Sequence, residues 1–382
     1  MTAARVPLVD LTAQYQSMKP EIDAAIAEVV AATAFVGTSE NPFVRAFESA
    51  FSNVTATQHC IACANGTDAI EIVLRAAGVG PGDEVLVPAV SWIATSEAVS
   101  TCGATPVFVD VLPGEYTIDP DAAAAKLTPR TVAIIPVHLY GTPARMDALQ
   151  QLSRSKNLFL LEDCAQAHGA QYRDRPVGSF GHAASFSFFP GKNLGAWGDA
   201  GAIVTSDEAL ARKCRMICQH GQAGRKHEHQ IEGRNSRMDG IQAAVLSAKL
   251  PRLEAWTSAR RRLAGQYTRD CGKLVEYVQT QPPGTRGVFH LFVVEVHRRE
   301  SIISALAEDG ITTAVHYPRP LPLLAAYERF HARAEDFPVA SRMTTRILSL
   351  PLYPELSDAQ QERVVSALRR AVSAAVPLDQ TV

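Results

Sequence analysis

Short apolar runs alternate with amphipathic segments through the first two-thirds of the chain. The runs are rich in β-branched and other apolar residues, which is typical of buried strands. They lie at residues 59–64, 84–89, 105–110, 131–137, 157–163, 184–189 and 201–206. Helical patterns separate several of them, at 69–78, 92–103 and 144–156. This alternation predicts a mostly parallel sheet with helices on both faces.

The pattern changes near residue 250. A long polar helix is predicted over 243–271, followed by the Pro/Gly-rich stretch QTQPPGTRG. Beyond it we expect a strand at 290–296, a helix at 299–310, a strand at 312–317 and a last helix from Asp358. We therefore expect a large domain over residues 1–250 and a smaller C-terminal α+β domain over 251–382.

Composition and charge narrow the class of protein. The 382 residues are 47% hydrophobic and 20% charged, with a net charge of -2, so no global field favours nucleic acid or an anionic membrane. The first residues lack the apolar core of a signal peptide, and no run reaches transmembrane length. The odd number of cysteines, seven, indicates reduced thiols. We expect a cytoplasmic enzyme.

The spacings of two cysteine pairs could be those of metal ligands. Cys60 and Cys63 form a CxxC pair, and Cys214 and Cys218 stand four residues apart on a predicted helix. The residues around the CxxC pair are small or apolar, and no second CxxC follows. Both pairs are therefore predicted to be packing residues, and no metal is expected.

Candidate chemistry begins with Lys192, in the stretch FSFFPGKNLGAWGDAG. Its apolar, glycine-rich flanks indicate a close approach of the backbone to a ligand rather than a solvated surface turn. Asp163 ends the run NLFLLED, and an acid at the carboxyl end of a strand either caps the next helix or lies where α/β sheets bind ligands. Gly66 and Thr67 open a helix whose free N–H groups can hold a phosphate, although most such turns hold none.

A nucleophilic lysine, a buried carboxylate and a phosphate cup are what a protein needs to use pyridoxal 5'-phosphate. The lysine forms a Schiff base with the aldehyde, and the acid keeps a proton on the pyridine nitrogen. Trp92 follows a predicted strand, where an aromatic ring either packs in the core or stacks on a flat heterocycle. The glycines of GAWGDAG do not match a dinucleotide fingerprint, because they precede a strand instead of opening a helix.

Together these motifs resemble the nucleotide-sugar aminotransferases of the DegT/DnrJ/EryC1/StrS family, which are pyridoxal-phosphate enzymes of fold type I. The resemblance runs from LVDLTAQYQ to LSLPLYPELSDAQQERVV. Its most specific pieces are ANGTDAI, PVHLYGTPARMDAL, LEDCAQAHGA, FSFFPGKNLGAWGDAGAIVT and GRNSRMDGIQAAVL. It implies an α/β fold like that of aspartate aminotransferase, a nucleotide-sugar substrate in amino-sugar biosynthesis, L-glutamate as amino donor, and a homodimer with shared active sites.

The resemblance also implies roles for single residues around the cofactor ring. Lys192 matches the Schiff-base lysine, which becomes the general base once an amino donor displaces it. Asp163 matches the acid paired with the pyridinium nitrogen. Gln166 matches the residue beside the phenolic oxygen, and Trp92 the aromatic residue that packs on the ring.

The remaining implied contacts concern the phosphate and the substrate. Gly66, Thr67 and Ser187 match phosphate contacts, and Asn235 matches a residue that reaches the phosphate of the neighbouring subunit. The residues that fall where relatives line the substrate pocket are Arg237, His316 and Tyr317.

The chain departs from the family pattern at two places. Where the family commonly has KYxH, this chain has Lys226, His227, Glu228 and His229, so His227 replaces a tyrosine. After HYPRPL the usual histidine is Pro322. Both changes bear on the identity of the sugar. Without a third ligand nearby, His227 and His229 do not predict a metal site.

The expected substrate is a dTDP- or UDP-linked 3-keto-6-deoxyhexose, because PGKNLGAWGDAG together with AQAHGA is typical of relatives that act on 3-keto sugars. Three alternatives are weighed against it. A 4-keto sugar would leave the chemistry unchanged. A relative that eliminates a hydroxyl carries histidine in place of the lysine, which Lys192 contradicts. A cofactor-binding regulator without activity is disfavoured by the intact set of Lys192, Asp163 and Gln166.

Overall fold

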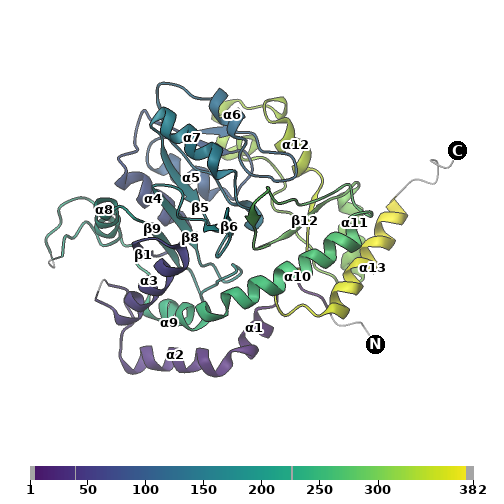
Figure 1. Ribbon diagram of the computed structural model, residues 1–382, viewed down its shortest axis with the longest axis horizontal. Helices are drawn as coiled ribbons and strands as arrows, with labels where there is room; N and C mark the ends of the chain where they lie inside the picture. Colours follow the sequence, from purple (N-terminus) through teal and green to yellow (C-terminus); the bar gives the residue numbers. More distant parts are fainter. Residues whose placement is uncertain (1–4, 39, 225–226, 376–382) are drawn as a thin grey trace.

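A seven-stranded sheet forms the centre of the large domain (Figure 1). The computed structural model describes residues 5–38, 40–224 and 227–375. Strand order is β1-β9-β8-β5-β4-β2-β3, and among these described strands β9 runs in the direction opposite to the other six. The strands are β1 (His59–Cys63), β2 (Glu84–Pro88), β3 (Thr105–Val109), β4 (Thr131–Ile134), β5 (Phe159–Asp163), β8 (Ala183–Ser187) and β9 (Gly201–Thr205). All seven strands predicted here, and the mostly parallel sheet, are confirmed.

Helices cover both faces of this sheet, and each face has its own apolar core. Alternate residues of a strand point to opposite faces. In β1, Ile61 therefore packs with the helices of one face, and Cys60 and Ala62 pack with those of the other. The first face carries α4 (Gly66–Ala76), α5 (Ala94–Thr101) and α8 (Glu208–Cys218). The second carries α3 (Pro42–Thr55), α6 (Pro120–Ala125), α7 (Met146–Lys156) and α9 (Gly240–Lys249).

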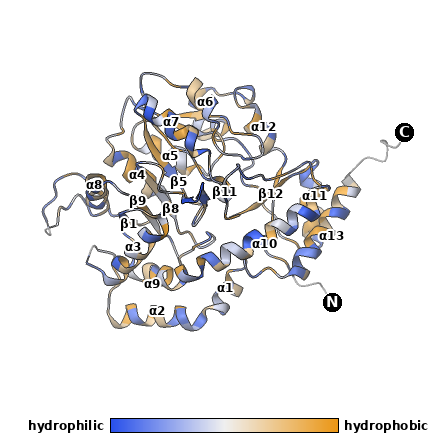
Figure 2. Cartoon of the chain, viewed as in Figure 1, coloured by the Kyte–Doolittle hydropathy of each residue, from blue (hydrophilic) through white to orange (hydrophobic). Residues whose placement is uncertain are grey.

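A second, antiparallel sheet forms the smaller core, with strand order β10-β12-β13. Its strands are β10 (Tyr277–Val278), β12 (Phe292–Glu295) and β13 (Ile347–Leu350), packed with α10 (Leu253–Cys271), α11 (Arg299–Glu308) and α13 (Asp358–Ala375). Helices α10 and α13 carry hydrophilic and hydrophobic residues in turn (Figure 2), as expected when one side is buried. Val6 also packs in this core and pairs with Ile311. The domain ranges 1–250 and 251–382 stay a prediction.

The remaining elements are short or lie at the edges. They are α1 (Leu11–Ser17), α2 (Lys19–Ala31), α12 (Pro338–Thr344), a small sheet of β11 (Thr285–Arg286), β6 (Gln171–Tyr172) and β7 (Arg175–Pro176), and 3-10 helices at Leu139–Gly141, Leu250–Arg252, Leu321–Leu323, Ala325–Phe330 and Ala334–Asp336. None of the helices described has the length and apolar character needed to cross a membrane.

Two of the predicted elements are wrong in extent: one helix is divided in two, and one strand is reduced to a single bridge. The long helix expected over 243–271 is divided into α9 and α10 by a 3-10 turn that contains Pro251. Proline lacks the N–H of a continuous helix and its ring clashes with the preceding turn. The strand expected at 312–317 is reduced to a single bridge between Ala314 and Ser349. Pro318 follows at once and cannot donate to a strand ladder.

Candidate active site

One cavity of about 540 Å³ opens where β5 and β8 end, between the large sheet and the smaller core. Ligand sites in open α/β sheets lie at this carboxyl edge. Leu8, His290 and Leu352 reach the same cavity from the N-terminal segment and the smaller core. Nine of the eleven residues expected from the sequence line it: Gly66, Thr67, Trp92, Asp163, Gln166, Ser187, Lys192, His316 and Tyr317.

Lys192 stands in a loop that several main-chain bonds hold in place. Its own N–H donates to Phe189 O at 2.8 Å, and Ala196 N donates to Phe188 O at 2.8 Å. Lys249 Nζ on α9 donates to Gly195 O at 2.7 Å. A Cβ on Gly195 would lie 2.2 Å from Pro190 O, so only glycine fits there. The loop therefore presents Lys192 from a rigid support.

The charge state of Lys192 suits a nucleophile. Burial lowers the pKa of its ammonium group from 10.5 to about 8, although the nearby Asp163 carboxylate acts in the opposite direction. With that pKa, about a tenth of the lysine is neutral at pH 7. The neutral amine is the form that attacks an aldehyde.

Asp163 ends β5 as a buried, hydrogen-bonded carboxyl group. Its Oδ2 accepts from Thr95 Oγ1 at 2.9 Å and its Oδ1 from Ala165 N at 3.1 Å. Burial raises the pKa of Asp163, while the two hydrogen bonds and Lys192 lower it. These donors fix the direction of the carboxylate toward the cavity, where it can pair with a protonated ring nitrogen.

The turn between β1 and α4 has the features of a phosphate cup. Asn65 caps α4 by accepting from Asp68 N at 2.8 Å, and the first helical bond joins Ala69 N to Asn65 O. The N–H groups of Gly66 and Thr67 therefore have no acceptor within the helix. A Cβ on Gly66 would lie 2.7 Å from the Cβ of Ser187, so glycine is required for this approach. The site fits an anion at the positive end of α4.

The opposite wall joins the large sheet to the segment around residue 316. Gln166 Oε1 accepts from Tyr140 N at 2.6 Å, and its Nε2 donates to Tyr317 Oη at 3.2 Å. The rings of Trp92 and Tyr317 lie 5.7 Å apart, centroid to centroid. His316 Nδ1 bonds to Ser349 Oγ at 2.9 Å, and burial lowers its pKa to about 4. This wall is aromatic and uncharged at neutral pH.

His290 is a cavity residue that the sequence reasoning missed. Its Nδ1 donates to Asn193 Oδ1 at 3.1 Å, because Asn193 Nδ2 is engaged with Val288 O at 3.2 Å. Burial and the charge of Lys192 lower the pKa of His290 well below its ordinary value. The signal in the sequence was its position at the start of the apolar run HLFVVEV. Asp199, in the glycine-rich stretch after Lys192, also lines the cavity and was missed.

Two expected site residues, Asn235 and Arg237, do not line the cavity. Asn235 is exposed and pairs through its backbone with Gln219. Arg237 lines a separate hollow beside Glu48 and Met238. A single chain therefore does not bring these two residues to Lys192.

The segment that departs from the family pattern lies apart from the cavity as well. His229 Nδ1 donates to His220 O at 2.8 Å, and His227 is exposed with a positive φ of 71°. Lys226 lies outside the described residues. Pro322 is buried in a 3-10 turn and does not line the cavity.

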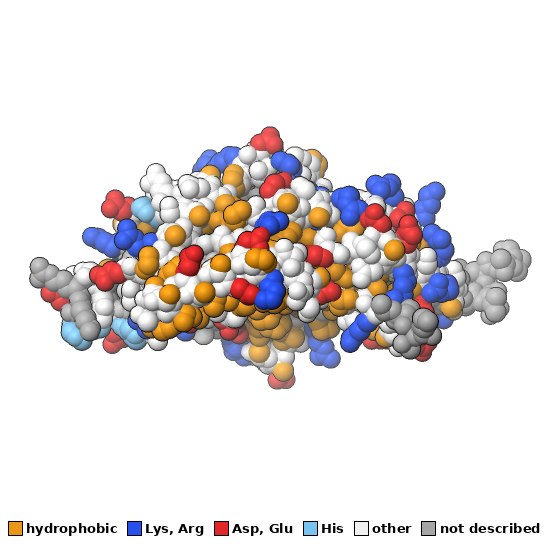
Figure 3. Space-filling model, turned by 90° about the horizontal axis from the view of Figure 1, so that it is seen from below, with side chains coloured by type: hydrophobic (Ala, Val, Ile, Leu, Met, Phe, Trp, Pro, Cys, Tyr) orange, Lys and Arg blue, Asp and Glu red, His pale blue; other side chains and the backbone are white. Residues whose placement is uncertain are grey.

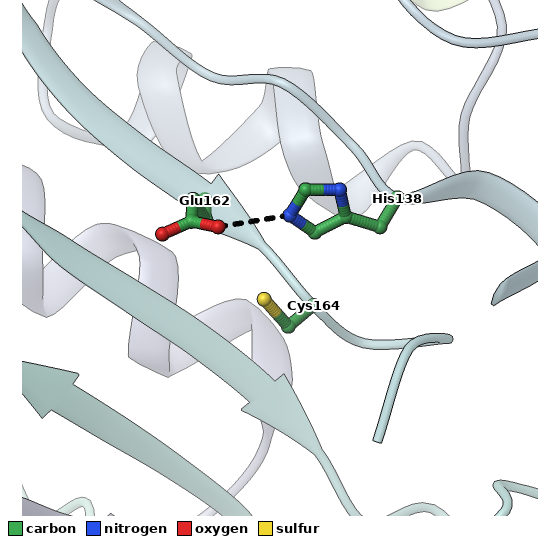
Figure 4. A group of neighbouring side chains, drawn as sticks. All are labelled: His138, Glu162 and Cys164. Carbon is green, nitrogen blue, oxygen red and sulfur yellow. Dashed lines mark hydrogen bonds and ion pairs between the residues drawn. The ribbon is translucent and has the colours of Figure 1, made fainter. Parts of the chain in front are cut away.

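Within the described residues, His138, Glu162 and Cys164 form a group with metal-ligand chemistry (Figure 4). Ala144 N donates to His138 Nδ1 at 3.0 Å, so His138 Nε2 donates to Glu162 Oε2 at 3.1 Å. The Glu162 oxygens also accept from the backbone N–H groups of Gly178, Phe180 and Gly181. Because these lone pairs are already engaged, the group is a structural network at the end of β5 and not a metal site.

The two cysteine pairs pack as expected. Cys63, Cys214 and Cys218 lie in the core on one face of the sheet and Cys60 in the core on the other. Burial raises the pKa of each thiol, so none is poised as a thiolate ligand.

A lysine, a carboxylate and a phosphate cup at the carboxyl edge of such a sheet define an aminotransferase-like enzyme of the pyridoxal-phosphate class. The chain belongs to the DegT/DnrJ/EryC1/StrS aminotransferase family, whose profile matches residues 16–369. The family and enzyme class expected from the sequence are thus confirmed.

Curated relatives cover almost the whole chain. A pleiotropic regulatory protein of Geobacillus stearothermophilus is 42% identical over 95% of this chain and 97% of its own. A UDP-N-acetyl-3-dehydro-alpha-D-glucosamine 3-aminotransferase of Acidithiobacillus ferrooxidans is 41% identical over 96% and 98%. A dTDP-3-amino-3,4,6-trideoxy-alpha-D-glucose transaminase of Streptomyces venezuelae is 42% identical over 96% of each chain.

Solved structures confirm the fold. DesV of S. venezuelae, in complex with a ketimine intermediate, superposes with a TM-score of 0.94 at 42% identity, covering 97% of this chain and 99% of its own. NtdA of Bacillus subtilis, with the bound cofactor PMP, gives a TM-score of 0.86 at 31% identity over 96% and 83%. The expected cofactor is confirmed at the level of the family.

Proposed function

We propose that this chain transfers an amino group from L-glutamate to a nucleotide-linked 3-keto sugar, giving a 3-amino sugar and 2-oxoglutarate. The observation that carries this proposal is the convergence of Lys192, Asp163 and the Gly66–Thr67 turn on one cavity. Each has the charge or the free donors that pyridoxal 5'-phosphate requires. The lining of the cavity therefore suits the chemical groups of the cofactor.

Each residue of the site would have one task. When bound, pyridoxal phosphate supplies an electron sink beside the carbon that loses its proton. Lys192 holds the cofactor and then moves that proton as a general base, for which its lowered pKa is suited. Asp163 holds a proton on the ring nitrogen, and Gln166 is placed for the phenolic oxygen. Gly66, Thr67 and Ser187 would bind the phosphate, while Trp92 packs on the ring.

The wall formed by His290, His316 and Tyr317 would position the substrates. Its imidazoles stay neutral because their pKa values are lowered by burial and by Lys192. Neutral groups at this wall can orient sugar hydroxyls by hydrogen bonding without adding a fixed charge.

A homodimer would complete the site. Large apolar side chains are exposed on the single chain, among them Val30, Phe35, Val36 and Trp197. Hydrophobic side chains gather on the face seen in Figure 3, from the side where α1 and α2 lie in Figure 1. An exposed apolar face of this kind indicates a protein contact, and a second copy is the partner that the proposal requires. The exposed Asn235 would then reach the partner's phosphate site.

The choice of a 3-keto sugar is supported by the relatives from Acidithiobacillus and Streptomyces, whose names specify amination at C3. The regulatory name of the Geobacillus relative supports a second candidate, a cofactor-binding regulator. Incubation of the purified holoenzyme with L-glutamate separates the two. Conversion of the cofactor to its amine form, with one equivalent of 2-oxoglutarate released, supports the aminotransferase. An unchanged spectrum would favour the regulator.

A further inference from the structure

Arg234 joins the segment that carries Asn235 to helix α4, whose first residues form the phosphate cup. Its Nη2 lies 3.0 Å from Asp68 Oδ1, and its Nη1 donates to Glu71 Oε2 at 2.8 Å. Asp68 and Glu71 stand three residues apart, so they share one side of α4. One guanidinium thus spans the first turn of the helix.

The same segment also contacts the chain just before α4 begins. Ser236 is fully buried, and its Oγ accepts from Ala64 N at 3.2 Å, directly before the N-cap residue Asn65. The backbone N–H of Arg234 donates to Ile217 O at 2.8 Å. Asn235 is therefore an exposed residue between Arg234 and Ser236, and the side chains of both neighbours bind to α4 or to the residue before its N-cap.

The positive charge of Arg234 bears on phosphate binding because its partner Asp68 lies in the first turn of α4. Asp68 directly follows Thr67 in the first turn of α4, where the helix end and its free N–H groups attract an anion. An uncompensated carboxylate at that point would repel a phosphate. In the described part of the chain, Arg234 is the ion-pair partner of Asp68, whereas Glu71 also lies 3.8 Å from Arg75 Nη1.

We propose that Arg234 is a positioning residue that couples the two phosphate sites of the dimer. It neutralises Asp68 and Glu71, so that α4 accepts the cofactor phosphate in its own subunit. It also sets the position of Asn235, which completes the phosphate site of the partner. This inference rests on the proposed function, because it needs a phosphate-bearing cofactor and shared sites.

The first test measures cofactor affinity. Apo dimers are titrated with pyridoxal 5'-phosphate, and the visible absorbance of the lysine-bound cofactor is followed. We expect Arg234→Gln to weaken binding about tenfold and to weaken competition by inorganic phosphate by a similar factor. Adding Asp68→Asn to Arg234→Gln should restore part of the affinity, because the repelling charge is removed. Arg75→Gln is the matched control and should weaken the affinity clearly less than Arg234→Gln, since Arg75 pairs with Glu71 at 3.8 Å and not with Asp68.

The outcomes separate this inference from the proposed function. Equal affinities for wild type and Arg234→Gln would overturn the role of Arg234 while leaving the enzyme assignment intact. A weakened Arg234→Gln that Asp68→Asn does not rescue would overturn the electrostatic role, provided that the thermal melting of the apo proteins shows them folded. A wild-type protein that binds no cofactor would overturn the proposed function itself.

Two hybrid dimers, isolated with different affinity tags, test the coupling. In the first, an Arg234→Gln chain is paired with a Lys192→Ala chain. The site with Lys192 then has a phosphate cup altered by Arg234→Gln, and it takes Asn235 from a chain whose Arg234 is unchanged. In the second, a chain with both substitutions is paired with a wild-type chain. The site with Lys192 then has the unaltered phosphate cup of the wild-type chain, and it takes Asn235 from the chain that carries Arg234→Gln. Only sites with Lys192 give the absorbance. We expect weaker binding in both, and normal binding in the second would overturn the coupling.

Discussion

Asn193 Oδ1 lies 3.1 Å from His290 Nδ1, which joins the residue after Lys192 to the segment that enters the smaller core. The bond fixes the tautomer of His290, because the amide oxygen can only accept. It also ties the lysine loop to a cavity wall that comes from a distant part of the chain. Asn193 is therefore a support for both sides of the site.

Asn193→Ala should lower the rate of the first half-reaction with L-glutamate on the order of tenfold, because Lys192 and His290 lose their common support. The buried Nδ1–H would be left unpaired, which costs about 1–3 kcal/mol of stability. Stopped-flow absorbance and thermal unfolding measure the two effects. Asn193→Asp keeps the acceptor for His290 but loses the donor to Val288 O and buries a carboxylate, so it should recover more of the rate than of the stability. A normal rate in Asn193→Ala would contradict the supporting role.

Lys192 should hold the cofactor covalently. Borohydride reduction of the holoenzyme followed by peptide mapping should find the pyridoxyl group on Lys192. Lys192→Ala should still bind the cofactor through the phosphate cup and Asp163, but without a reducible bond and without turnover. A label on another lysine of the wild-type protein would overturn the assignment.

Attachment of the cofactor to the apoenzyme should depend on pH. The neutral amine reacts, and the pKa of Lys192 is lowered to about 8, so the attachment rate should rise with pH and level off above about pH 8. Asp163 raises the pKa of Lys192, so Asp163→Asn should shift the midpoint to lower pH. Rates measured by stopped flow across the pH range test both. A midpoint near the ordinary lysine value of 10.5 would contradict the desolvated environment.

Inactive Lys192→Ala and Asn235→Ala chains should complement each other. In the hybrid, one site combines Lys192 from one chain with Asn235 from the other and is intact. Random mixing of equal amounts should recover about a quarter of the wild-type activity, since half of the dimers are hybrids with one good site. Each variant alone is the control. Failure to recover activity despite proven subunit exchange would argue against shared sites.

The position of the keto group should be discriminated sharply. With L-glutamate as donor, kcat/KM should be larger for a 3-keto nucleotide hexose than for its matched 4-keto isomer. A carbonyl displaced by about an ångström costs on the order of a hundredfold in rate. Steady-state kinetics with dTDP- and UDP-linked pairs measure the preference. A preference for the 4-keto sugar would reverse the regiochemistry but not the reaction class.

Local signals in the sequence were enough for the strands and for the candidate reacting groups, which line one cavity. The seven strands of the large sheet follow from short apolar runs, and Asp163 was placed at a strand end by the same pattern. Lys192 stands in a glycine-rich turn and Gly66 in a turn of small residues, and in each case the local composition is the signal. Such features depend on neighbours within a few residues, so a linear reading detects them.

Tertiary structure alone decided which distant residues support that chemistry. Asn193 meets His290 across 97 residues, and Arg234 meets Glu71 across 163. Neither pairing follows from periodicity, because packing of whole elements brings the side chains together. The strand expected at 312–317 is a different case, because Pro318 ends the run locally and pairing with β13 is limited to the bridge between Ala314 and Ser349. The sequence by itself determined the sheet and the candidate reacting groups, and the packing of the two cores decided which residues support them.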